Sequence, residues 1–401
     1  MKSKVVIGLS GGVDSSVAAW VLKEKGYDVT GLFMKNWHDT TGLIQSECHW
    51  EDDIMFAEMV AKKLELPFHQ VDLSVPYRQR VVDYMFREYE KGRTPNPDVL
   101  CNREIKFDSF AEEARKLGGD FVATGHYCRK DEILSKGKTI FRLLSGSDTN
   151  KDQSYFLCQL NQDQLRSALF PIGHMTKPEV RQIAGKLGLA TARRKDSQGI
   201  CFVGKVDLPT FLQQKLEART GDIIEITDKS LFPAFADGYP NGPISDEELV
   251  SLTGPFRYDP DSDSGMVVGK HKGAHFYTIG QRKGMNVGGH KEALFVIATN
   301  VEKNIVYTGE GHSHPGLNRK GLFIRSDEIH WIRTDLRMMP GETRDYMVRI
   351  RYRQALQKAR LYCHEKGMYI LFDNLQRGIA PGQFAAWYDG DEVIGSGVID
   401  S

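Results

Sequence analysis

Short apolar runs alternate with longer stretches of helical periodicity over the first 125 residues. The apolar runs read VVIGL, VTGLFM, FHQVDL and DFVATG. Between them apolar residues recur at helical spacing, as at Ile54, Ala57, Ala61 and Leu64. This alternation predicts an α/β fold with a doubly wound, mostly parallel sheet.

The pattern changes twice after this α/β region. The string KPEVRQIAGKLG predicts a helix, with proline at its start and glycine near its end. Residues 221–265 are rich in Pro, Gly and Asp, which indicates an acidic surface insertion around a small domain. Beyond Leu294, alternating apolar residues and frequent turn residues predict β-hairpins that close into a compact β-barrel. We therefore predict an α/β domain with a helical extension (1–205), a small central domain (206–290) and a C-terminal β-barrel (291–401).

Composition narrows the class of protein. Lys+Arg and Asp+Glu both number 53 in 401 residues, so a nucleic-acid partner would have to be held by local basic patches. No long apolar segment suggests a signal peptide or membrane span, and we expect a cytoplasmic protein. The 6 cysteines are scattered and form no CxxC, which argues against a disulfide framework and makes a zinc or iron–sulfur site a weak interpretation.

The string GLSGGVDSS indicates a phosphate site. Gly8, Gly11 and Gly12 let backbone N–H groups approach an anion, and the helix that begins near Asp14 points its positive end at the same place. The string fits neither GxxxxGK[ST] nor GxGxxG, so neither γ-phosphate transfer nor dinucleotide binding is the first choice. The alternative is a strand-to-helix turn without a ligand. Two further strand ends, at Met34 and at Gly125, should reach the same edge of the sheet.

Two cysteines are candidate reactive groups. In GRTPNPDVLCNREIKF, Asp98 precedes Cys101 by three residues, and we expect the prolines to keep this segment out of a helix. A carboxylate and a thiol can then meet over one turn; the alternative is a buried thiol that serves as a small hydrophobe. Cys201 follows the basic residues of RRKDSQGICF, which could lower a thiol pKa of about 8.5 toward neutrality. Its alternative is again a buried thiol, with the basic run as a solvated face.

Strand alternation in YMVRIRYR places Arg349, Arg351 and Arg353 on one face. A row of arginines suits a phosphate backbone, whereas the alternative is the solvated outer face of a barrel.

Taken in order, SGGVDS, GLFMKNW, GRTPNPDVLCNREIKF, ATGHY, NKDQSYFL, DSQGICF, YTIGQRKG, RYRQ and APGQ resemble the tRNA-specific 2-thiouridylases nearly from end to end. That family thiolates the wobble uridine of certain tRNAs. The resemblance implies an ATP-pyrophosphatase loop that cleaves ATP between the α- and β-phosphates, with Asp14 helping to position Mg²⁺. The residues implied for ATP binding are Gly8, Leu9, Ser10, Gly11, Gly12, Val13, Asp14, Ser15, Met34 and Gly125.

The resemblance further implies a sulfur relay. Cys201 would carry a persulfide supplied by a donor protein, and ATP would adenylate the uridine C2 oxygen. Cys101 would be the partner thiol that releases the sulfur, either by forming a disulfide with Cys201 or by freeing sulfide, with Asp98 as general acid/base. An amide-like carbonyl resists attack, so both activation and a strong sulfur nucleophile are needed. The implied tRNA contacts are Asn96, Pro97, Asp98, His126, Lys151, Asp152, Gln153, Arg351, Tyr352 and Gln383. We expect a monomer that binds tRNA and no membrane.

Two other functions compete. One is an ATP-pyrophosphatase-loop ligase that adenylates a carboxylate or ureido group for amidation, which would need neither cysteine. The other is a tRNA-binding module with an inert nucleotide fold, which would bind tRNA without releasing pyrophosphate.

Overall fold

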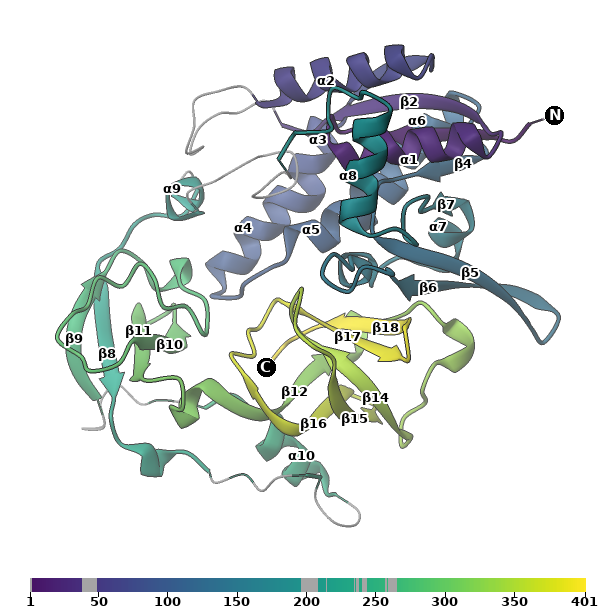
Figure 1. Cartoon of the computed structure of the whole chain (residues 1–401). Helices are drawn as coiled ribbons and strands as arrows, with labels where there is room; N and C mark the ends of the chain where they lie inside the picture. The colour runs from purple at the N-terminus through teal and green to yellow at the C-terminus, as the bar shows by residue number, and fades with distance from the viewer. Residues whose placement is uncertain are drawn as a thin grey trace.

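The computed structural model describes residues 2–37, 49–195, 208–213, 215–233, 235, 238–239, 244–256, 258 and 265–401. Figure 1 shows three parts: an N-terminal α/β domain at the top, a larger C-terminal sheet below it, and a small four-stranded sheet at the left, beside the C-terminal sheet. The boundaries predicted at residues 205 and 290 stay predictions.

A five-stranded parallel sheet forms the centre of the N-terminal domain, in the order β3-β2-β1-β4-β7. Its strands are β1 (Lys4–Gly8), β2 (Asp28–Lys35), β3 (Phe68–Asp72), β4 (Phe121–Ala123) and β7 (Ala168–Leu169). The four apolar runs supply β1 to β4, which confirms the predicted parallel α/β fold. Alternation along β1 sends Val5 and Ile7 into one core and Val6 into the other, so both faces of the sheet are buried.

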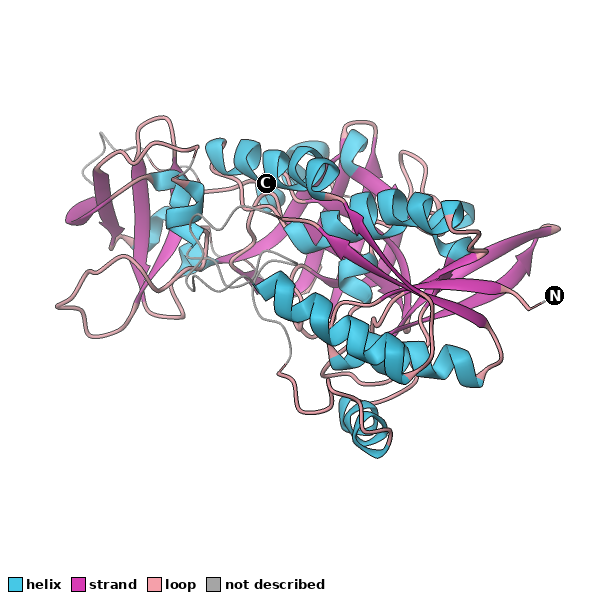
Figure 2. Ribbon diagram, turned by 90° about the horizontal axis from the view of Figure 1, so that it is seen from above, coloured by secondary structure: helices cyan, strands magenta, loops and turns pink. Residues whose placement is uncertain are grey.

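Helices cover both faces, as seen from above in Figure 2. Residues of α1 (Val13–Glu24), α2 (His49–Lys63) and α8 (Lys177–Lys186) share one hydrophobic core. The other face packs against the connected helices of residues 74–116. These are α3 (Ser74–Tyr77), η1 (Arg78–Val82), α4 (Asp83–Glu90), α5 (Pro97–Leu100), η2 (Cys101–Ser109) and α6 (Phe110–Lys116). Shorter helices follow as η3 (Ser154–Leu157), α7 (Gln162–Ser167) and α9 (Leu208–Leu212). The predicted helix at KPEVRQIAGK is α8, with Pro178 in its first turn.

The small sheet has the order β10-β11-β8-β9. It consists of β8 (Gly221–Ile226), β9 (Gly265–His271), β10 (Leu294–Asn300) and β11 (Ile305–Glu310), with η4 (Lys229–Leu231), α10 (Asp246–Thr253) and η5 (Ala274–Phe276) between them. The hairpin β10–β11 was expected to begin the C-terminal barrel. It pairs instead with β8, where Val306 lies opposite Ile223, and buries its apolar side chains in the small core.

The C-terminal sheet has nine strands, and eight of them run in the order β12-β16-β15-β14-β17-β18-β6-β5. They are β12 (Asn318–Arg325), β14 (Thr343–Arg349), β15 (Gln357–His364), β16 (Gly367–Arg377), β17 (Phe384–Asp389) and β18 (Glu392–Val398), with β5 (Cys128–Ser135) and β6 (Lys138–Ser145) from the N-terminal part of the chain. The ninth strand, β13 (Ile329–Trp331), pairs with β18, and η6 (Pro315–Leu317), η7 (Ser326–Glu328) and η8 (Thr334–Leu336) complete this region.

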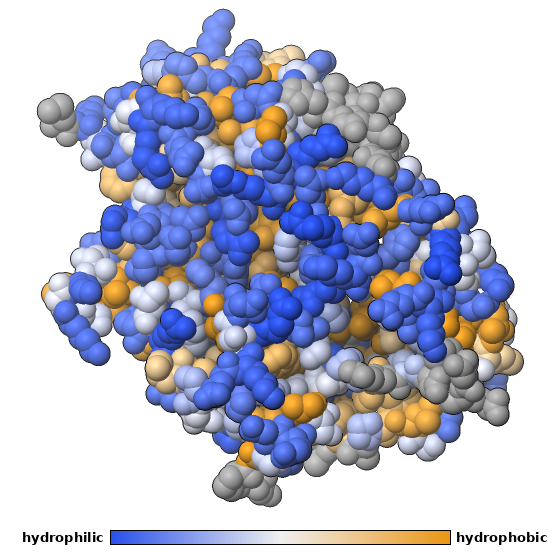
Figure 3. Space-filling view, turned by 180° about the vertical axis from the view of Figure 1, so that it is seen from behind, coloured by the Kyte–Doolittle hydropathy of each residue, from blue (hydrophilic) through white to orange (hydrophobic). Residues whose placement is uncertain are grey.

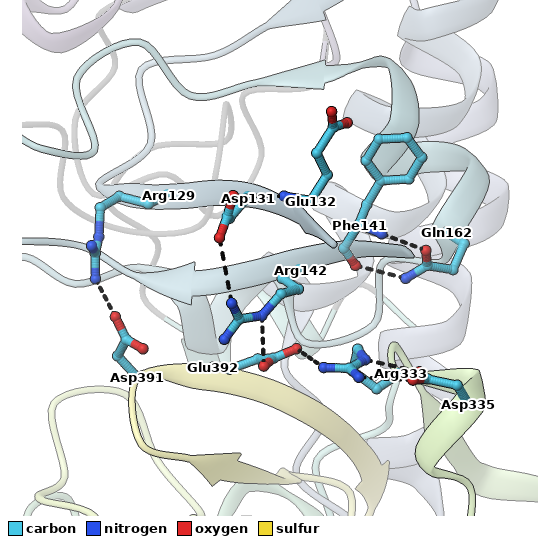
Figure 4. A network of polar contacts seen from close by, with 10 residues as sticks. All are labelled: Arg129, Asp131, Glu132, Phe141, Arg142, Gln162, Arg333, Asp335, Asp391 and Glu392. Carbon is cyan, nitrogen blue, oxygen red and sulfur yellow. Dashed lines mark hydrogen bonds and ion pairs between the residues drawn. The ribbon is translucent and has the colours of Figure 1, made fainter. Parts of the chain in front are cut away.

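The hairpin β5–β6 therefore joins the two large domains through main-chain pairing with β18. Figure 4 shows the ion pairs around this junction. Glu392 of β18 accepts from Arg142 Nε of β6 at 2.8 Å and from Arg333 Nη1 at 2.6 Å. Its side chain is 6% exposed, so the network lies inside the junction. At the rim, Arg129 pairs with Asp391.

Hydrophilic residues cover most of the face seen in Figure 3. Among the residues that the structure describes, no helix combines the length and apolar character needed to cross a membrane.

Candidate active site

The glycine turn joins β1 to α1 at the carboxyl edge of the parallel sheet. Leu9 N–H donates to the Leu32 carbonyl of β2 at 3.0 Å, which extends the strand pairing up to the turn. Gly11 has φ +71°, and a Cβ there would lie 2.3 Å from the Asp53 carbonyl oxygen, so this position requires glycine. Gly12 is the N-cap of α1 without any side-chain cap. The first-turn N–H groups of a helix have no intrahelical partner, and here they are presented for an anion.

The turn after β4 meets the start of α1. A Cβ on Gly125 would lie 2.7 Å from the Ser15 main-chain nitrogen, so only glycine allows this approach. The strand order turns back between β1 and β4, and this crevice is where open α/β sheets bind ligands. Met34, at the end of the neighbouring strand β2, is 6% exposed and packs in the core that also contains Cys101. The three predicted strand ends therefore share one edge of the sheet.

Asp14 is engaged by a lysine from a distant part of the chain. Both of its carboxylate oxygens lie 2.8 Å from Lys177 Nζ, and Oδ1 also accepts from the Tyr127 hydroxyl at 2.7 Å. The sequence patterns did not single out Lys177. A cation in the first turn of a helix opposes the helix dipole, which is the signal that could have identified it.

The geometry does not fit a magnesium site built from protein groups alone. Within the described part of the chain, no group of three or more His, Cys, Asp or Glu side chains is placed to hold a metal ion. Asp14, the predicted metal ligand, forms an ion pair with Lys177.

The basic segment that precedes Cys201 docks on the glycine turn. Arg194 Nη1 donates to the Gly11 carbonyl at 2.8 Å, and its Nη2 lies 2.6 Å from Asp53 Oδ1. Thr191 is fully buried and donates its hydroxyl to Ser16 Oγ of α1 at 3.0 Å. Cys201 itself lies outside the described residues. Residues 191–194, which precede Cys201 in the sequence, therefore pack against the glycine turn and the start of α1.

The expectation that prolines keep residues 96–101 out of a helix is wrong. Asn96 is an N-cap whose Oδ1 accepts from Val99 N–H at 3.3 Å, and α5 begins at Pro97. Proline is favourable at the first position of a helix because its missing N–H would have no partner there and its φ is already helical. Asp98 and Cys101 consequently lie three residues apart along one continuous helical segment. Cys101 is fully buried.

Other cysteines are embedded in the protein. Burial raises the pKa of the Cys128 thiol well above its usual value and raises the pKa of Cys158 to about 12. Both therefore stay protonated near neutral pH and act as small apolar residues.

The residues predicted to contact tRNA around position 150 are mostly occupied by internal contacts. Asp152 is 6% exposed and accepts from Gly146 N–H, Ser154 N–H and Arg349 Nη1. Gln153 Oε1 accepts from the N–H of Tyr127 at 3.0 Å. Lys151 is half-buried. This segment holds the Tyr127 backbone and the end of β14.

His126 is buried. Its Nδ1 lies 2.8 Å from Thr124 Oγ1. Burial, with a smaller contribution from Lys106, lowers the pKa of His126 well below its usual value, so the imidazole is neutral at physiological pH.

The predicted row of three arginines on one strand face does not form. β14 ends at Arg349, whose guanidinium lies 3.1 Å from Asp152 Oδ2 and is 11% exposed. Arg351 donates to the Gly378 carbonyl, and Arg353 has φ +63° in the turn that follows. Residues 351–353 therefore lie in the turn between β14 and β15, where the alternation of the strand no longer applies.

These turn residues line a pocket of 430 Å³ instead. Its lining is basic and amide-rich: Arg351, Tyr352, Arg353, Gln354, Gln357, Leu375, Gln376 and Arg377. Tyr352 packs on Phe156 with ring centroids 4.3 Å apart. A guanidinium group can form a bidentate pair of hydrogen bonds with one phosphate, so this pocket is suited to bind the phosphates of an RNA backbone. Arg377 was missed because it lies in β16, far from the RYR string.

A second pocket of 410 Å³ shares Arg351 with the first. It is lined by Thr278, Ile279, Gly280, Gln281, Arg351, Ala380 and Gln383, and so lies where the small sheet meets the C-terminal domain.

The chain matches three family models and relatives of nearly the same length. Residues 3–205 match a family described as "tRNA methyl transferase HUP domain", 251–310 its PRC-barrel domain and 323–399 an aminomethyltransferase β-barrel domain. The tRNA-specific 2-thiouridylase MnmA of Flavobacterium johnsoniae is 57% identical over 396 residues, covering 99% of both chains. The chain belongs to the tRNA-specific 2-thiouridylase family.

Further members of the 2-thiouridylase family match just as completely. The protein of that name from Christiangramia forsetii is 58% identical over 99% of both chains, and that from Karelsulcia muelleri is 44% identical over 99% of both. The description of the N-terminal family names a methyl transferase. The full-length relatives carry the thiouridylase name, and they cover all three parts of the chain.

Proposed function

We propose that this protein is an ATP-dependent tRNA-uridine 2-sulfurtransferase that thiolates C2 of the wobble uridine. The observation that carries the proposal is the carboxyl edge of the parallel sheet, where the glycine turn and the Gly125 turn meet beside the core that contains Cys101. Membership of the 2-thiouridylase family supports the substrate class. An amidating ligase would need no thiol, so it would not explain why Cys101 shares a helical segment with Asp98.

ATP binds with its phosphates at the N-terminus of α1. The backbone N–H groups of residues 11–15 hold the departing pyrophosphate, which has the charge and oxygen atoms that a helix N-terminus binds best. Lys177 is held by Asp14 within reach of this turn. It supplies from α8 the positive charge that the turn itself lacks, and it can neutralise pyrophosphate as that group leaves.

Bound magnesium would supply positive charge that neutralises the phosphate groups of the nucleotide. Asp14 would have to exchange its contact with Lys177 to become a ligand.

Sulfur transfer then proceeds in balanced steps. The uridine C2 oxygen attacks the α-phosphorus and pyrophosphate leaves. The terminal sulfur of a Cys201 persulfide attacks C2, AMP departs with the former C2 oxygen, and the base is left joined to Cys201 through two sulfur atoms. The Cys101 thiolate attacks the Cys201 sulfur, which forms a Cys101–Cys201 disulfide and releases the thiocarbonyl. Asp98 accepts the Cys101 proton. A thiol reductant must then reopen the disulfide.

The partners in this proposal are tRNA and a persulfide-donor protein, and the enzyme acts as a cytoplasmic monomer. RNA backbone contacts come from the basic pocket around Arg351 and Arg377, where none of the described lining residues is acidic. The target base must leave its stack to reach the site.

Incubation with unmodified tRNA, ATP, magnesium and a persulfide donor tests the proposal. Nucleoside mass spectrometry should find 2-thiouridine, and AMP should form in equal amount. Cys101→Ser and Cys201→Ser should each abolish thiolation, while Cys158→Ser should retain it. Amidation activity, or thiolation that survives either of the first two substitutions, would overturn the relay.

A further inference from the structure

The segment that leads into the Asp98–Cys101 helix is held by the C-terminal domain. Thr94 N–H donates to the Pro381 carbonyl at 2.7 Å. A Cβ on Gly382, where φ is +90°, would lie 2.9 Å from the Thr94 nitrogen and 3.0 Å from its carbonyl carbon. Glycine at 382 is therefore required for two backbones from different domains to touch here.

Gln383 uses its whole side-chain amide at this contact. Its Nε2 donates to the Thr94 carbonyl at 2.9 Å and to the Pro95 carbonyl at 3.3 Å. Its Oε1 accepts from Asn96 Nδ2 at 3.4 Å. The other end of the Asn96 amide caps α5 through Val99 N–H. Two amide side chains thus link the C-terminal domain to the first turn of the helix that carries Asp98 and Cys101.

Two flanking contacts reinforce the link. Arg93 lies 2.6 Å from Glu88 Oε2 and 2.9 Å from Asp400 Oδ1, and its side chain is 17% exposed, so it ties the end of α4 to the end of the chain. Thr94 Oγ1 lies 3.0 Å from Thr278 Oγ1, beside the small sheet. All three parts of the protein therefore meet at residues 93–96.

The junction pocket adjoins the same amide. Gln383 and Thr278 line the 410 Å³ pocket together with Arg351. A ligand in that pocket would contact groups that also hold residues 94–96.

We propose that Gln383 is a positioning residue: acting through Asn96, it orients the Asp98–Cys101 helix and couples this helix to the RNA bound beside Arg351. This inference rests on the proposed thiolation. In this role Gln383 acts through contacts within the protein, whereas a tRNA-contact residue would act by binding tRNA directly.

Single-turnover thiolation and tRNA affinity, measured separately, distinguish the two roles. Gln383→Leu should lower the thiolation rate constant at saturating tRNA by about tenfold or more, while the dissociation constant for tRNA changes by less than about threefold. Gly382→Ala should act in the same direction, because it displaces Thr94 without removing any side chain that RNA could touch. Gln70→Leu is the matched control, since the Gln70 amide lines neither pocket and donates to Glu58 Oε1 at 3.2 Å on the surface of the α/β domain. It should leave the rate constant unchanged.

Hydrogen exchange supplies a readout that needs no activity. Amides of residues 97–104 should exchange faster in Gln383→Leu than in the unsubstituted protein, and at the normal rate in Gln70→Leu. Normal exchange together with an unchanged saturating rate, or a loss confined to tRNA affinity, would overturn the positioning role. If the unsubstituted enzyme did not thiolate tRNA at all, the proposed function would fail, and the exchange result would still decide the structural link.

Discussion

The ion pairs at the β6–β18 junction allow a quantitative test of how the two large domains hold together. Glu392→Gln removes the one carboxylate shared by Arg142 and Arg333 (Figure 4). Breaking a buried ion pair by removing one partner costs about 3–5 kcal/mol, because the remaining charge is left uncompensated.

Two features of the structure reduce that cost. Arg333 keeps a second carboxylate, Asp335, at 2.8 Å. The Arg142 side chain is 26% exposed, so water can solvate part of its charge. We therefore expect Glu392→Gln to lower the free energy of unfolding by about 2–3 kcal/mol.

The neighbouring residue provides the control. Asp391 pairs with Arg129 on the same hairpin, but the two side chains are 53% and 37% exposed. Exposed pairs contribute about 0–1 kcal/mol, so Asp391→Asn should cost no more than that. Urea unfolding followed by circular dichroism measures both variants against the parent protein, with the slope m checked for constancy. Equal costs for the two substitutions, or no cost for Glu392→Gln, would refute the reasoning.

Three further predictions follow from single side chains. Asn36 is 1% exposed, and neither of its amide atoms has a hydrogen-bond partner among the described residues, so Asn36→Leu should raise the free energy of unfolding by about 1–2 kcal/mol. Asn102→Leu loses a hydrogen bond to a main-chain carbonyl and should lower the free energy of unfolding by about 1–3 kcal/mol in the same urea assay. The pKa of His126 is lowered in the folded state, so the unfolded chain binds the proton more readily. The free energy of unfolding should therefore fall as the pH drops below about 6.5, by at most about 1.4 kcal/mol per pH unit. His126→Gln should flatten this pH dependence. Arg377→Ala should reduce the salt dependence of tRNA binding by about one unit of slope in a titration, and Arg360→Ala, outside the pocket, should not.

Local patterns in the sequence were enough to predict the parallel sheet and the glycine turn at its carboxyl edge. Short apolar runs predicted the parallel strands, since both faces of the inner strands β1 and β2 are buried. The glycine turn was predictable because positive φ at Gly11 and the close approach at Gly125 are requirements of single positions. Parallel strands necessarily bring their carboxyl ends together, which placed Met34 beside the turn.

Contacts between distant residues could not be predicted in the same way. Lys177 reaches Asp14 across 163 positions, and Gln383 reaches Thr94 across 289. Contacts between residues so far apart in the sequence produce no periodic pattern from which they could be predicted. The pairing of β6 with β18 could not be predicted either, because the edge strand of each hairpin could have paired with a different sheet.

The segment 96–101 shows how a correct local rule can be applied at the wrong place. Proline disfavours the interior of a helix, but Pro97 occupies the first turn, where it is favourable. The arginines of RYRQ show the opposite limit: alternation holds only as far as the strand, and β14 ends before Arg351.

Isotope transfer tests the central claim most directly. A tRNA carrying oxygen-18 at C2 of the wobble uridine would be thiolated with unlabelled ATP in ordinary water, and the AMP analysed by mass spectrometry. Adenylation of the C2 oxygen predicts that one labelled oxygen appears in AMP for each 2-thiouridine formed. Unlabelled AMP accompanying full thiolation, with the label released to water, would contradict it.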